Sequence, residues 1–343
     1  MYKVLNSKGL GVAGRQNELI ELALTHGFQG VEIDMTDLVG RHDALGKEFA
    51  CQFLQSAKMD IGTFDLPIQF GGTDEEFVAS CEKLETIMDL AATLNAKRCR
   101  VKIEPNNESS SFQENFERHR ERIEDIAGRF EEHGIRIGLY LQASSAVEAD
   151  GNYKFIQTAE EILTLVKGVG HANVGLSLDT WEWVLGGGAM DQISELDLAL
   201  LSEVIVADVG ATATPGSYTA EDRVLPCTGG DAFSLKLCQF LKEKGFDGAM
   251  SMGTEAHMFS GAPNRHDVVG KFSTMIDKLA EGEDPTIVEE PEVEEGEEGA
   301  EGAEGEATDS AAKDKEAAAA DGKEAGSTET AMKEAPKAAS AKA

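Results

Sequence analysis

Basic residues are scarce in this chain. Among 343 residues, Lys and Arg number 31 and Asp and Glu number 63, which gives a formal net charge of −32 at pH 7. A surface this negative repels the phosphate backbone of nucleic acids. We therefore expect no nucleic-acid partner.

Paired cysteines, an export signal and long apolar runs are also missing. The five cysteines show no Cys-X-X-Cys spacing, and residues 1–15 lack a charged and then apolar leader. No apolar run approaches the roughly 20 residues that cross a bilayer. We expect free thiols, a reducing cytoplasmic location, a soluble protein and no membrane partner.

The last segment lacks the residues that build a core. From residue 281 onward the chain is rich in Glu, Ala, Gly and Lys, with almost no branched or aromatic side chains. Such a segment cannot bury enough apolar surface to offset its ordering entropy. We predict a folded domain over residues 1–280 and a disordered acidic tail over residues 281–343. The tail is either a solubilising extension or an arm that binds a protein partner.

Residues 1–280 alternate between strand-like and helix-like patterns. The segments that favour strands are 3–12, 27–34, 59–66, 97–104, 134–142, 173–179, 203–209 and 245–252. Helical periodicity separates them, and a glycine marks several helix-to-strand junctions. Eight such units in about 280 residues favour an α/β fold of the closed (β/α)8 TIM-barrel type over a doubly wound sheet.

The stretch from residue 173 to 188, NVGLSLDTWEWVLGGG, combines a buried strand with a polar end. Asp179, Trp181 and Glu182 follow the apolar run directly and precede three glycines. Ligands in parallel α/β folds bind at the carboxyl ends of the strands. These residues are therefore candidates for an active-site edge. The alternative is that Asp179 only caps the following turn.

Several segments carry a family resemblance, in order: FQGVEID, IGTFDLPIQFGG, SFQENFERHRERI, HGIRIGL, YKFIQT, NVGLSLDTWEW and EKGFDGAMS. Together they resemble the sugar-phosphate isomerase/epimerase family with the xylose-isomerase-like TIM barrel, from about residue 3 to 279. The resemblance implies isomerisation or epimerisation of a small sugar-like molecule.

The resemblance also implies a divalent metal site. In the family, a Glu on strand five, an Asp on strand six, a His on strand seven and a Glu on strand eight hold the ion. The ion stabilises an enediolate, and the two glutamates act as acid and base. The matching residues here are Tyr140, Asp179, Ile205 and Gly253. A single carboxylate, Asp179, binds a divalent ion poorly, so we expect no metal cofactor.

Other positions match the family's substrate-binding side. Arg223, in an RVLP run, matches an arginine near the substrate, and we place Trp181, Glu32 and Lys102 with it as substrate-binding candidates. The following PCTGG departs from the family's PGEG turn for phosphate or substrate recognition. Glu32 and the helical His119 also suit structural roles. Lys102 suits either a Schiff base or a surface pair with the neighbouring Glu104.

Three hypotheses follow. The favoured one is a degenerate family member without a metal, which binds a small sugar-like ligand or a partner in a pocket lined by Trp181, Asp179, Glu182 and Arg223. The second is an active isomerase or epimerase with a rebuilt acid/base or Mn²⁺, Co²⁺, Mg²⁺ or Zn²⁺ site. Its catalytic candidates are Glu182, Asp208, Glu255 and His257, with Asp65, Lys102 and Glu104 on the opposite side. The third is an interaction protein that displays the acidic tail.

Overall fold

A computed structural model describes residues 1–107, 110–144, 153–214, 217–254, 258 and 264–287. The chain divides into two compact units, Met1–Glu290 and Pro291–Ala343, and every described residue belongs to the first. The described chain continues past the predicted boundary to residue 287, and Lys242 contacts Glu281 at 2.8 Å. Most of the predicted tail lies outside the described residues, so its disorder stays a prediction.

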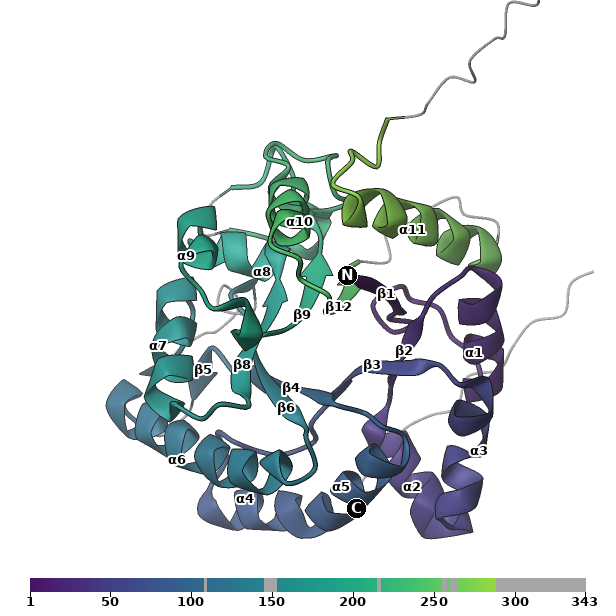
Figure 1. The fold of residues 1–343 in the computed structure, drawn as a ribbon. Coiled ribbons are helices and arrows are strands. Elements are labelled where there is room, and N and C mark those ends of the chain that lie inside the picture. The colour runs from purple at the N-terminus through teal and green to yellow at the C-terminus, as the bar shows by residue number, and fades with distance from the viewer. Residues whose placement is uncertain (108–109, 145–152, 215–216, 255–257, 259–263, 288–343) are drawn as a thin grey trace, which may run out of the picture. The chain divides into compact units, whose positions relative to one another are not determined.

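Eight parallel strands form a closed barrel, which confirms the predicted fold (Figure 1). Their order around the barrel is β1-β12-β9-β8-β6-β4-β3-β2. The strands are β1 (Tyr2–Leu5), β2 (Gly30–Ile33), β3 (Asp60–Asp65), β4 (Arg98–Ile103), β6 (Arg136–Leu141), β8 (Val174–Asp179), β9 (Leu201–Val206) and β12 (Ala249–Met252). The first strand pairs with the last, Tyr2 with Ala249, and this pairing closes the sheet.

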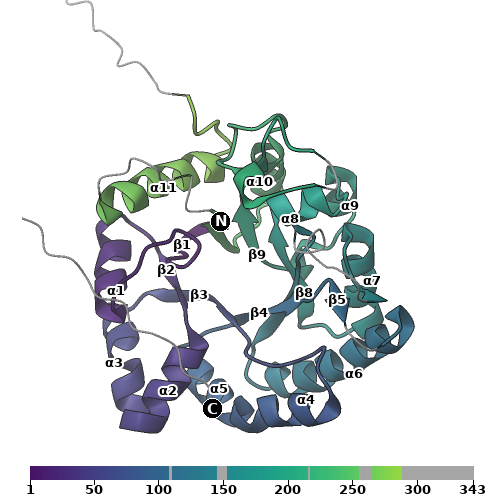
Figure 2. The same ribbon diagram turned by 180° about the vertical axis from the view of Figure 1, so that it is seen from behind.

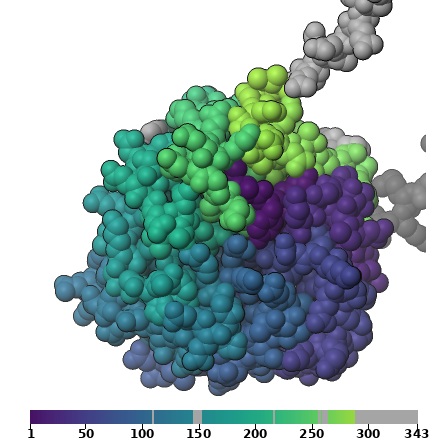
Figure 3. Space-filling model, viewed as in Figure 1, coloured from purple at the N-terminus to yellow at the C-terminus, as the bar shows by residue number. Residues whose placement is uncertain are grey.

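Helices surround the barrel in both views (Figures 1 and 2). They are α1 (Gln16–Thr25), α2 (Met35–Leu45), α3 (Lys47–Ala57), α4 (Asp74–Ser80), α5 (Leu84–Thr93), α6 (Phe112–Glu131), α7 (Ala159–Val169), α8 (Thr180–Leu185), α9 (Met190–Ser194), α10 (Phe233–Glu243) and α11 (Arg265–Ala280). The space-filling view shows the purple N-terminal segment directly beside the green C-terminal part of the barrel (Figure 3). No helix in the described part of the chain is long and apolar enough to cross a membrane.

The apolar core lies between the strands and the helices, and alternation along each strand puts polar side chains inside the barrel. In β4, Cys99, Val101 and Ile103 belong to the apolar core. Arg100, at the intervening position, reaches Ser177 of β8, also at an alternate position of its strand. The barrel interior is therefore polar, and its side chains near the carboxyl ends of the strands can contact one another.

Short turns account for the main differences from the predicted elements. The strand predicted at 3–12 ends at Leu5, because Asn6 begins a turn and its side chain accepts a hydrogen bond from the Gly9 amide at 2.8 Å. Helix α3 begins at Lys47, because Gly46, with φ of 87°, separates it from α2. Helix α9 spans only Met190–Ser194, and the strand predicted at 203–209 already begins at Leu201.

Two short antiparallel pairs extend beyond the barrel. One joins β5 (Asn106–Asn107) to β7 (Tyr153–Lys154). The other joins β10 (Asp208–Val209) to β11 (Arg223–Val224). The second pair separates Asp208 from β9, in which the sequence had placed it, and returns the chain to the barrel end at Arg223. All five cysteines are free, as predicted.

Candidate functional site

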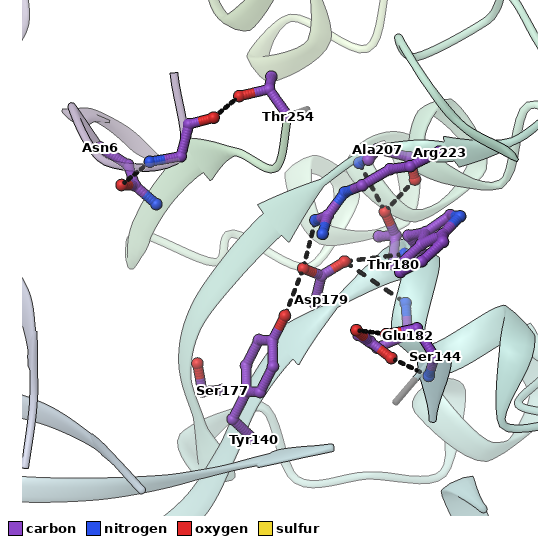
Figure 4. A network of polar contacts seen from close by, with 12 residues as sticks. Asn6, Tyr140, Ser144, Ser177, Asp179, Thr180, Glu182, Ala207, Arg223 and Thr254 are labelled. Carbon is purple, nitrogen blue, oxygen red and sulfur yellow. Dashed lines mark hydrogen bonds and ion pairs between the residues drawn. The ribbon is translucent and has the colours of Figure 1, made fainter. Parts of the chain in front are cut away.

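Asp179 is the centre of a buried polar network where β8 meets α8 (Figure 4). One carboxylate oxygen, Oδ1, accepts hydrogen bonds from the backbone amides of Trp181 at 3.0 Å and Glu182 at 3.5 Å. The other, Oδ2, accepts from the Tyr140 hydroxyl at 2.9 Å and from Arg223 Nη2 at 2.5 Å. The predicted cap is therefore present, and the same side chain also joins β6 and β11 to the site.

Arg223 reaches this network from β11. Its guanidinium lies over the Trp181 ring, 5.0 Å from the ring centroid, and pairs with Asp179. Burial alone would lower the pKa of Arg223, but Asp179, Tyr140 and Glu182 together outweigh it and raise that pKa above its ordinary value. The result is a fixed cation inside the barrel end. The predicted proximity of Asp179, Trp181 and Arg223 is thus observed.

Gly253 makes room for this cation. A Cβ at Gly253 would lie 1.8 Å from Arg223 Nη2 and 3.0 Å from Ile205 Cγ2, so any side chain here would collide with the guanidinium. Ile205 pairs in register with Asp179 on β8. The guanidinium therefore occupies the space between the residues at the family's strand-six and strand-eight metal positions.

The donor set at the four family metal positions does not fit a divalent ion. Tyr140 offers a phenol, Ile205 an alkyl group and Gly253 no side chain, while both oxygens of Asp179 already accept hydrogen bonds. Divalent cations need several oxygen, nitrogen or sulfur ligands. Within the described ranges, no group of three or more His, Cys, Asp or Glu residues could hold a metal.

Tyr140 is a neutral donor rather than an anion. Burial, together with the charges of Asp179 and Glu182, raises the pKa of its hydroxyl well above 10. The phenol therefore keeps its proton and directs it at Asp179, as the close-up shows (Figure 4). At the position that matches the family's strand-five glutamate, this chain therefore has a hydrogen-bond donor.

Glu182 lies on α8 beside Asp179 and is held by one residue. The Ser144 hydroxyl donates to Glu182 Oε1 at 2.6 Å, and the Ser144 amide donates to Oε2 at 2.8 Å. Burial and the neighbouring Asp179 raise the pKa of Glu182 to about 7, against the lowering effect of the Ser144 hydrogen bonds. A carboxyl group with this pKa can give or accept a proton near neutral pH. Ser144 carried no sequence signal of this role.

The four residues expected to line a pocket are packed against one another. Trp181, Asp179, Glu182 and Arg223 are exposed by only 4, 4, 5 and 7%. They form a closed polar cluster more than an open cleft.

Asp208, one of the catalytic candidates, is held by backbone amides. Its carboxylate accepts hydrogen bonds from the amides of Cys227 at 2.8 Å and Ser234 at 2.9 Å, and burial raises its pKa. It therefore fixes the chain between β10 and α10, and its partner Ser234 lies 3.1 Å from the hydroxyl of Thr180, the residue after Asp179. The other two catalytic candidates, Glu255 and His257, lie outside the described residues.

A second polar cluster fills the barrel interior around Arg100 of β4. Its Nε and Nη2 donate to the two carboxylate oxygens of Glu203, at 2.8 and 3.0 Å. The same guanidinium contacts Glu32 and Asp65, each at 3.1 Å. Sequence reasoning missed Arg100 and Glu203. The available signal was the alternation of Arg98, Arg100 and Lys102 with apolar residues, which places charges on the inward face of the strand.

Glu32 and Lys102, two predicted substrate contacts, belong to this second cluster. Burial, offset in part by Arg100, raises the pKa of Glu32 to about 7. Lys102 pairs with Asp65 at 2.8 Å and not with Glu104. Asp65 has a lowered pKa because Arg100 and Lys102 outweigh the effect of burial. The Lys102 side chain is 45% exposed, which argues against a desolvated Schiff-base lysine.

His119 takes the structural role that the sequence left open. Its ring is buried in α6, Nδ1 lies 2.8 Å from the Asn115 carbonyl oxygen, and the ring centroid lies 4.7 Å from that of Phe155. Burial lowers the pKa of His119 to about 4. A neutral histidine that bonds to its own helix supports packing rather than chemistry.

Together, the closed parallel barrel and the polar cluster at the carboxyl ends of its strands define a TIM-barrel protein with its candidate site at the usual end. Residues 20–275 match the family model described as "Xylose isomerase-like TIM barrel", and the chain belongs to this family.

Known proteins agree with this placement. An inosose isomerase of Halalkalibacterium halodurans is 34% identical over 100 residues, a region that spans 28% of this chain and only 34% of that protein. A xylose isomerase domain protein of Alicyclobacillus acidocaldarius has a TM-score of 0.69 at 17% identity, covering 82% of this chain and 98% of that one. The zinc-bound IOLI protein has a TM-score of 0.66 at 18% identity, with the same coverage.

A D-psicose 3-epimerase of Clostridium cellulolyticum, solved with D-tagatose, is similar in fold as well. Its TM-score is 0.59 at 14% identity, over 82% of this chain and 98% of that one. At these identities the solved structures establish the shared fold, and the site of this chain has to be judged from its own residues.

Proposed function

We propose that this chain is a degenerate member of the xylose isomerase-like family that binds a small sugar-like ligand without a divalent metal. The single observation behind the proposal is the guanidinium of Arg223, which pairs with Asp179 in the space that Gly253 leaves open. A fixed cation beside Asp179 repels a metal ion there and supplies positive charge of its own. The sugar-like ligand is inferred from the family and from relatives named for inosose and D-psicose.

The metal content of the purified chain tests this proposal. The chain is incubated with Mn²⁺, Co²⁺, Mg²⁺ or Zn²⁺, and gel filtration removes the unbound ion. Elemental mass spectrometry then measures the metal that remains bound. We expect no equivalent of metal that depends on Asp179. One bound equivalent that the Asp179→Asn variant loses would overturn the proposal.

A surface histidine pair makes a control necessary. His26 Nε2 lies 3.3 Å from His266 Nδ1, and two imidazoles this close can retain a transition metal without any role in the barrel. The His26→Gln variant removes that source. Metal that His26→Gln removes and Asp179→Asn leaves in place therefore agrees with the proposal.

A second candidate function is an isomerase or epimerase whose proton transfer uses Glu182. The observation in its favour is the pKa of about 7 of this carboxyl group, next to the Arg223 cation that could stabilise an enediolate. The test is loss of the carbon-bound proton of D-fructose or D-tagatose in D₂O, followed by NMR. Exchange that Glu182→Gln abolishes would favour this activity, and absence of exchange favours simple binding.

A cytoplasmic location and a protein partner for the acidic tail remain predictions from the sequence. Deletion of residues 288–343 tests whether the tail has a function separate from that of the barrel. If the barrel only displays the tail, this deletion alone removes the cellular phenotype, and the Arg223 and Glu182 variants have none. If the barrel binds the ligand, the deletion leaves ligand binding unchanged.

A further inference from the structure

A small pocket of about 230 Å³ lies at the amino ends of the barrel strands, at the other end of the barrel from the Asp179 network. Its lining includes Arg98 and Arg136, the first residues of β4 and β6, and the chain just before β12. Asp179, in contrast, is the last residue of β8. Tyr140 lies four residues after Arg136 on β6, about 13 Å away at roughly 3.3 Å per residue. The pocket is therefore separate from the candidate functional site.

Positive charge dominates this pocket. The ionisable lining residues are Arg98, Arg136, Lys244 and Asp247. Three are basic and one is acidic, in a chain with a formal net charge of −32 at pH 7. Lys244 caps α10, where a cation offsets the partial negative charge of the helix end, and its Nζ lies 5.7 Å from the centroid of the Phe240 ring. The pocket as a whole thus keeps surplus positive charge.

Arg98 and Arg136 are direct neighbours on adjacent strands. They pair in register between β4 and β6, and neighbouring strands lie about 4.8 Å apart, so both side chains leave the sheet on the same face. Like charges in this arrangement repel each other. Burial and the charge of Arg98 accordingly lower the pKa of Arg136, against a smaller effect of Asp197. The fold therefore keeps two cations together at a cost in stability.

Neither arginine has an acidic partner among the residues that the structure describes. Arg98 Nη1 donates to the Tyr2 hydroxyl at 2.8 Å, and Arg136 Nη2 donates to the Ala199 carbonyl oxygen. These contacts hold the side chains at the barrel end without neutralising them. A guanidinium has five N–H donors, so further donors of both groups remain for a ligand.

The size and the donors of the pocket suit one phosphate-sized anion. Its volume is below the roughly 300 Å³ at which small-molecule sites begin, so it can hold a single such group rather than a whole metabolite. Two planar guanidinium groups side by side match the oxygens of a phosphate, and hydrogen bonds between charged groups are about twice as strong as those between neutral groups. A dianion between the arginines would also offset their repulsion.

We propose that this pocket binds a phosphate dianion, either inorganic phosphate or the phosphoryl group of an ester, between Arg98 and Arg136 with Lys244 beside it. The site goes beyond the proposed function, because it lies at the other end of the barrel and uses no residue of the Asp179 network. Arg98 also reaches Tyr2 of β1. The bound anion therefore connects the amino ends of β1, β4 and β6 and stabilises the barrel.

The melting temperature of the full chain tests the binding of phosphate. Sodium phosphate is titrated against sodium chloride of equal ionic strength. We expect phosphate to raise the melting temperature by about 2 to 5 °C at ten times its dissociation constant, and then only with the logarithm of its concentration. Salting-out by phosphate also stabilises proteins, but it acts on every variant alike. A rise no larger than that with chloride would overturn the proposal.

Matched arginine variants test the place. Arg136→Gln removes one cation of the pocket, whereas Arg129→Gln removes the same charge from a half-exposed position of α6. We expect Arg136→Gln to keep only the rise from salting-out and Arg129→Gln to keep the full wild-type rise. Arg136→Lys retains the charge but not the planar set of donors, and it should weaken the apparent affinity about tenfold.

A variant at the rim of the pocket keeps the test decisive if Arg136→Gln does not fold. Lys244→Glu changes an exposed side chain and puts a negative charge beside the pocket. It should weaken the apparent affinity for phosphate by about tenfold or more. A full wild-type rise in Lys244→Glu, or in Arg136→Gln, would overturn the site. The metal analysis that tests the proposed function is independent of either result.

Glycerol 3-phosphate distinguishes the two sources of the phosphate group. It carries the same phosphoryl dianion on a small ester. A tighter apparent affinity for it than for inorganic phosphate identifies an ester as the ligand, and an equal or weaker one identifies phosphate itself. A chain whose melting temperature responds to neither beyond salting-out does not have this site.

Discussion

Arg223 and Asp179 are 44 residues apart in the chain, and their side chains meet at 2.5 Å with little exposure to solvent. The β10–β11 pair returns the chain over the barrel end and makes this contact possible. Both charges are desolvated, so neither can lose the other without cost. The pair is therefore a structural element as well as the centre of the candidate site.

Replacement of the cation alone should destabilise the barrel strongly. In Arg223→Met, Asp179 stays buried with a hydroxyl and two amides but no positive charge. We expect the free energy of unfolding in urea to fall by about 3 to 5 kcal/mol. The double variant Arg223→Met with Asp179→Asn should recover part of this loss. Equal loss in the single and double variants would contradict a charge-based explanation.

Gly253→Ala should be tolerated only without Arg223. The added methyl group would lie 1.8 Å from Nη2 of that residue, so the single variant must displace the guanidinium from Asp179. We expect Gly253→Ala and Arg223→Met to be non-additive by about 1 to 3 kcal/mol in a double-mutant cycle of unfolding free energies. Gly128→Ala is the control, because its Cβ meets nothing within 4 Å and α6 should gain about 0.5 to 1 kcal/mol.

Glu182 should make the barrel less stable as pH rises from about 4.5 to 7. Its pKa is about 7 in the folded chain and 4.5 as an ordinary value, so in this window the folded state keeps a proton that the unfolded state releases. Each pH unit then lowers the free energy of unfolding by up to about 1.4 kcal/mol. In Glu182→Gln this contribution disappears. Urea titrations at pH 5, 6, 7 and 8 measure the difference.

The free energy of unfolding of the wild type minus that of Glu182→Gln should fall from pH 5 to pH 7 and stay constant above. Glu32 has a similarly raised pKa and provides an internal comparison, because its own pH dependence persists in the Glu182→Gln variant. A difference that is constant from pH 5 to 8 would mean that Glu182 ionises normally.

Lysine should not replace arginine at position 100. Arg100 holds Glu203 through two parallel hydrogen bonds and reaches Glu32 and Asp65 with the same planar group, a geometry that an ammonium group cannot reproduce. We expect Arg100→Lys to lower the free energy of unfolding by about 2 kcal/mol or more. Arg120→Lys, whose ion-pair partners Glu117 and Glu124 on α6 are exposed, should change it by less than about 0.5 kcal/mol. If both variants lowered the free energy of unfolding equally, the hydrogen-bond geometry of Arg100 would not explain the effect.

Periodic features were predictable from the sequence. The alternation of strands and helices, and the polar end of the strand at Asp179, are local patterns that led to the barrel and its active edge. The contact of Asp179 with Arg223 was expected only through the family resemblance. Nothing in the local sequence specifies that the guanidinium takes the space above Gly253, because that contact depends on the β10–β11 pair.

Interior and loop contacts escaped prediction for similar reasons. Glu203 sits in a mostly apolar strand and gave no sign that it neutralises Arg100 across the barrel. Ser144 holds Glu182 from a loop, where spacing carries no periodic signal. The two amide partners of Asp208 come from a loop and from the start of α10, so its anchoring contacts also gave no sequence signal.

Because β1 pairs with β12, the barrel can close only after most of the chain has been synthesised. The amino group of Met1 contacts the carbonyl oxygen of Phe246, a residue 245 positions later. At translation rates of roughly 5 to 20 residues per second, β1 waits about 12 to 50 s for the neighbour that covers one of its edges. During this interval the nascent barrel exposes an open strand edge to other chains. Its yield in cells should therefore depend on chaperones and on translation speed more than the stability of the finished barrel suggests.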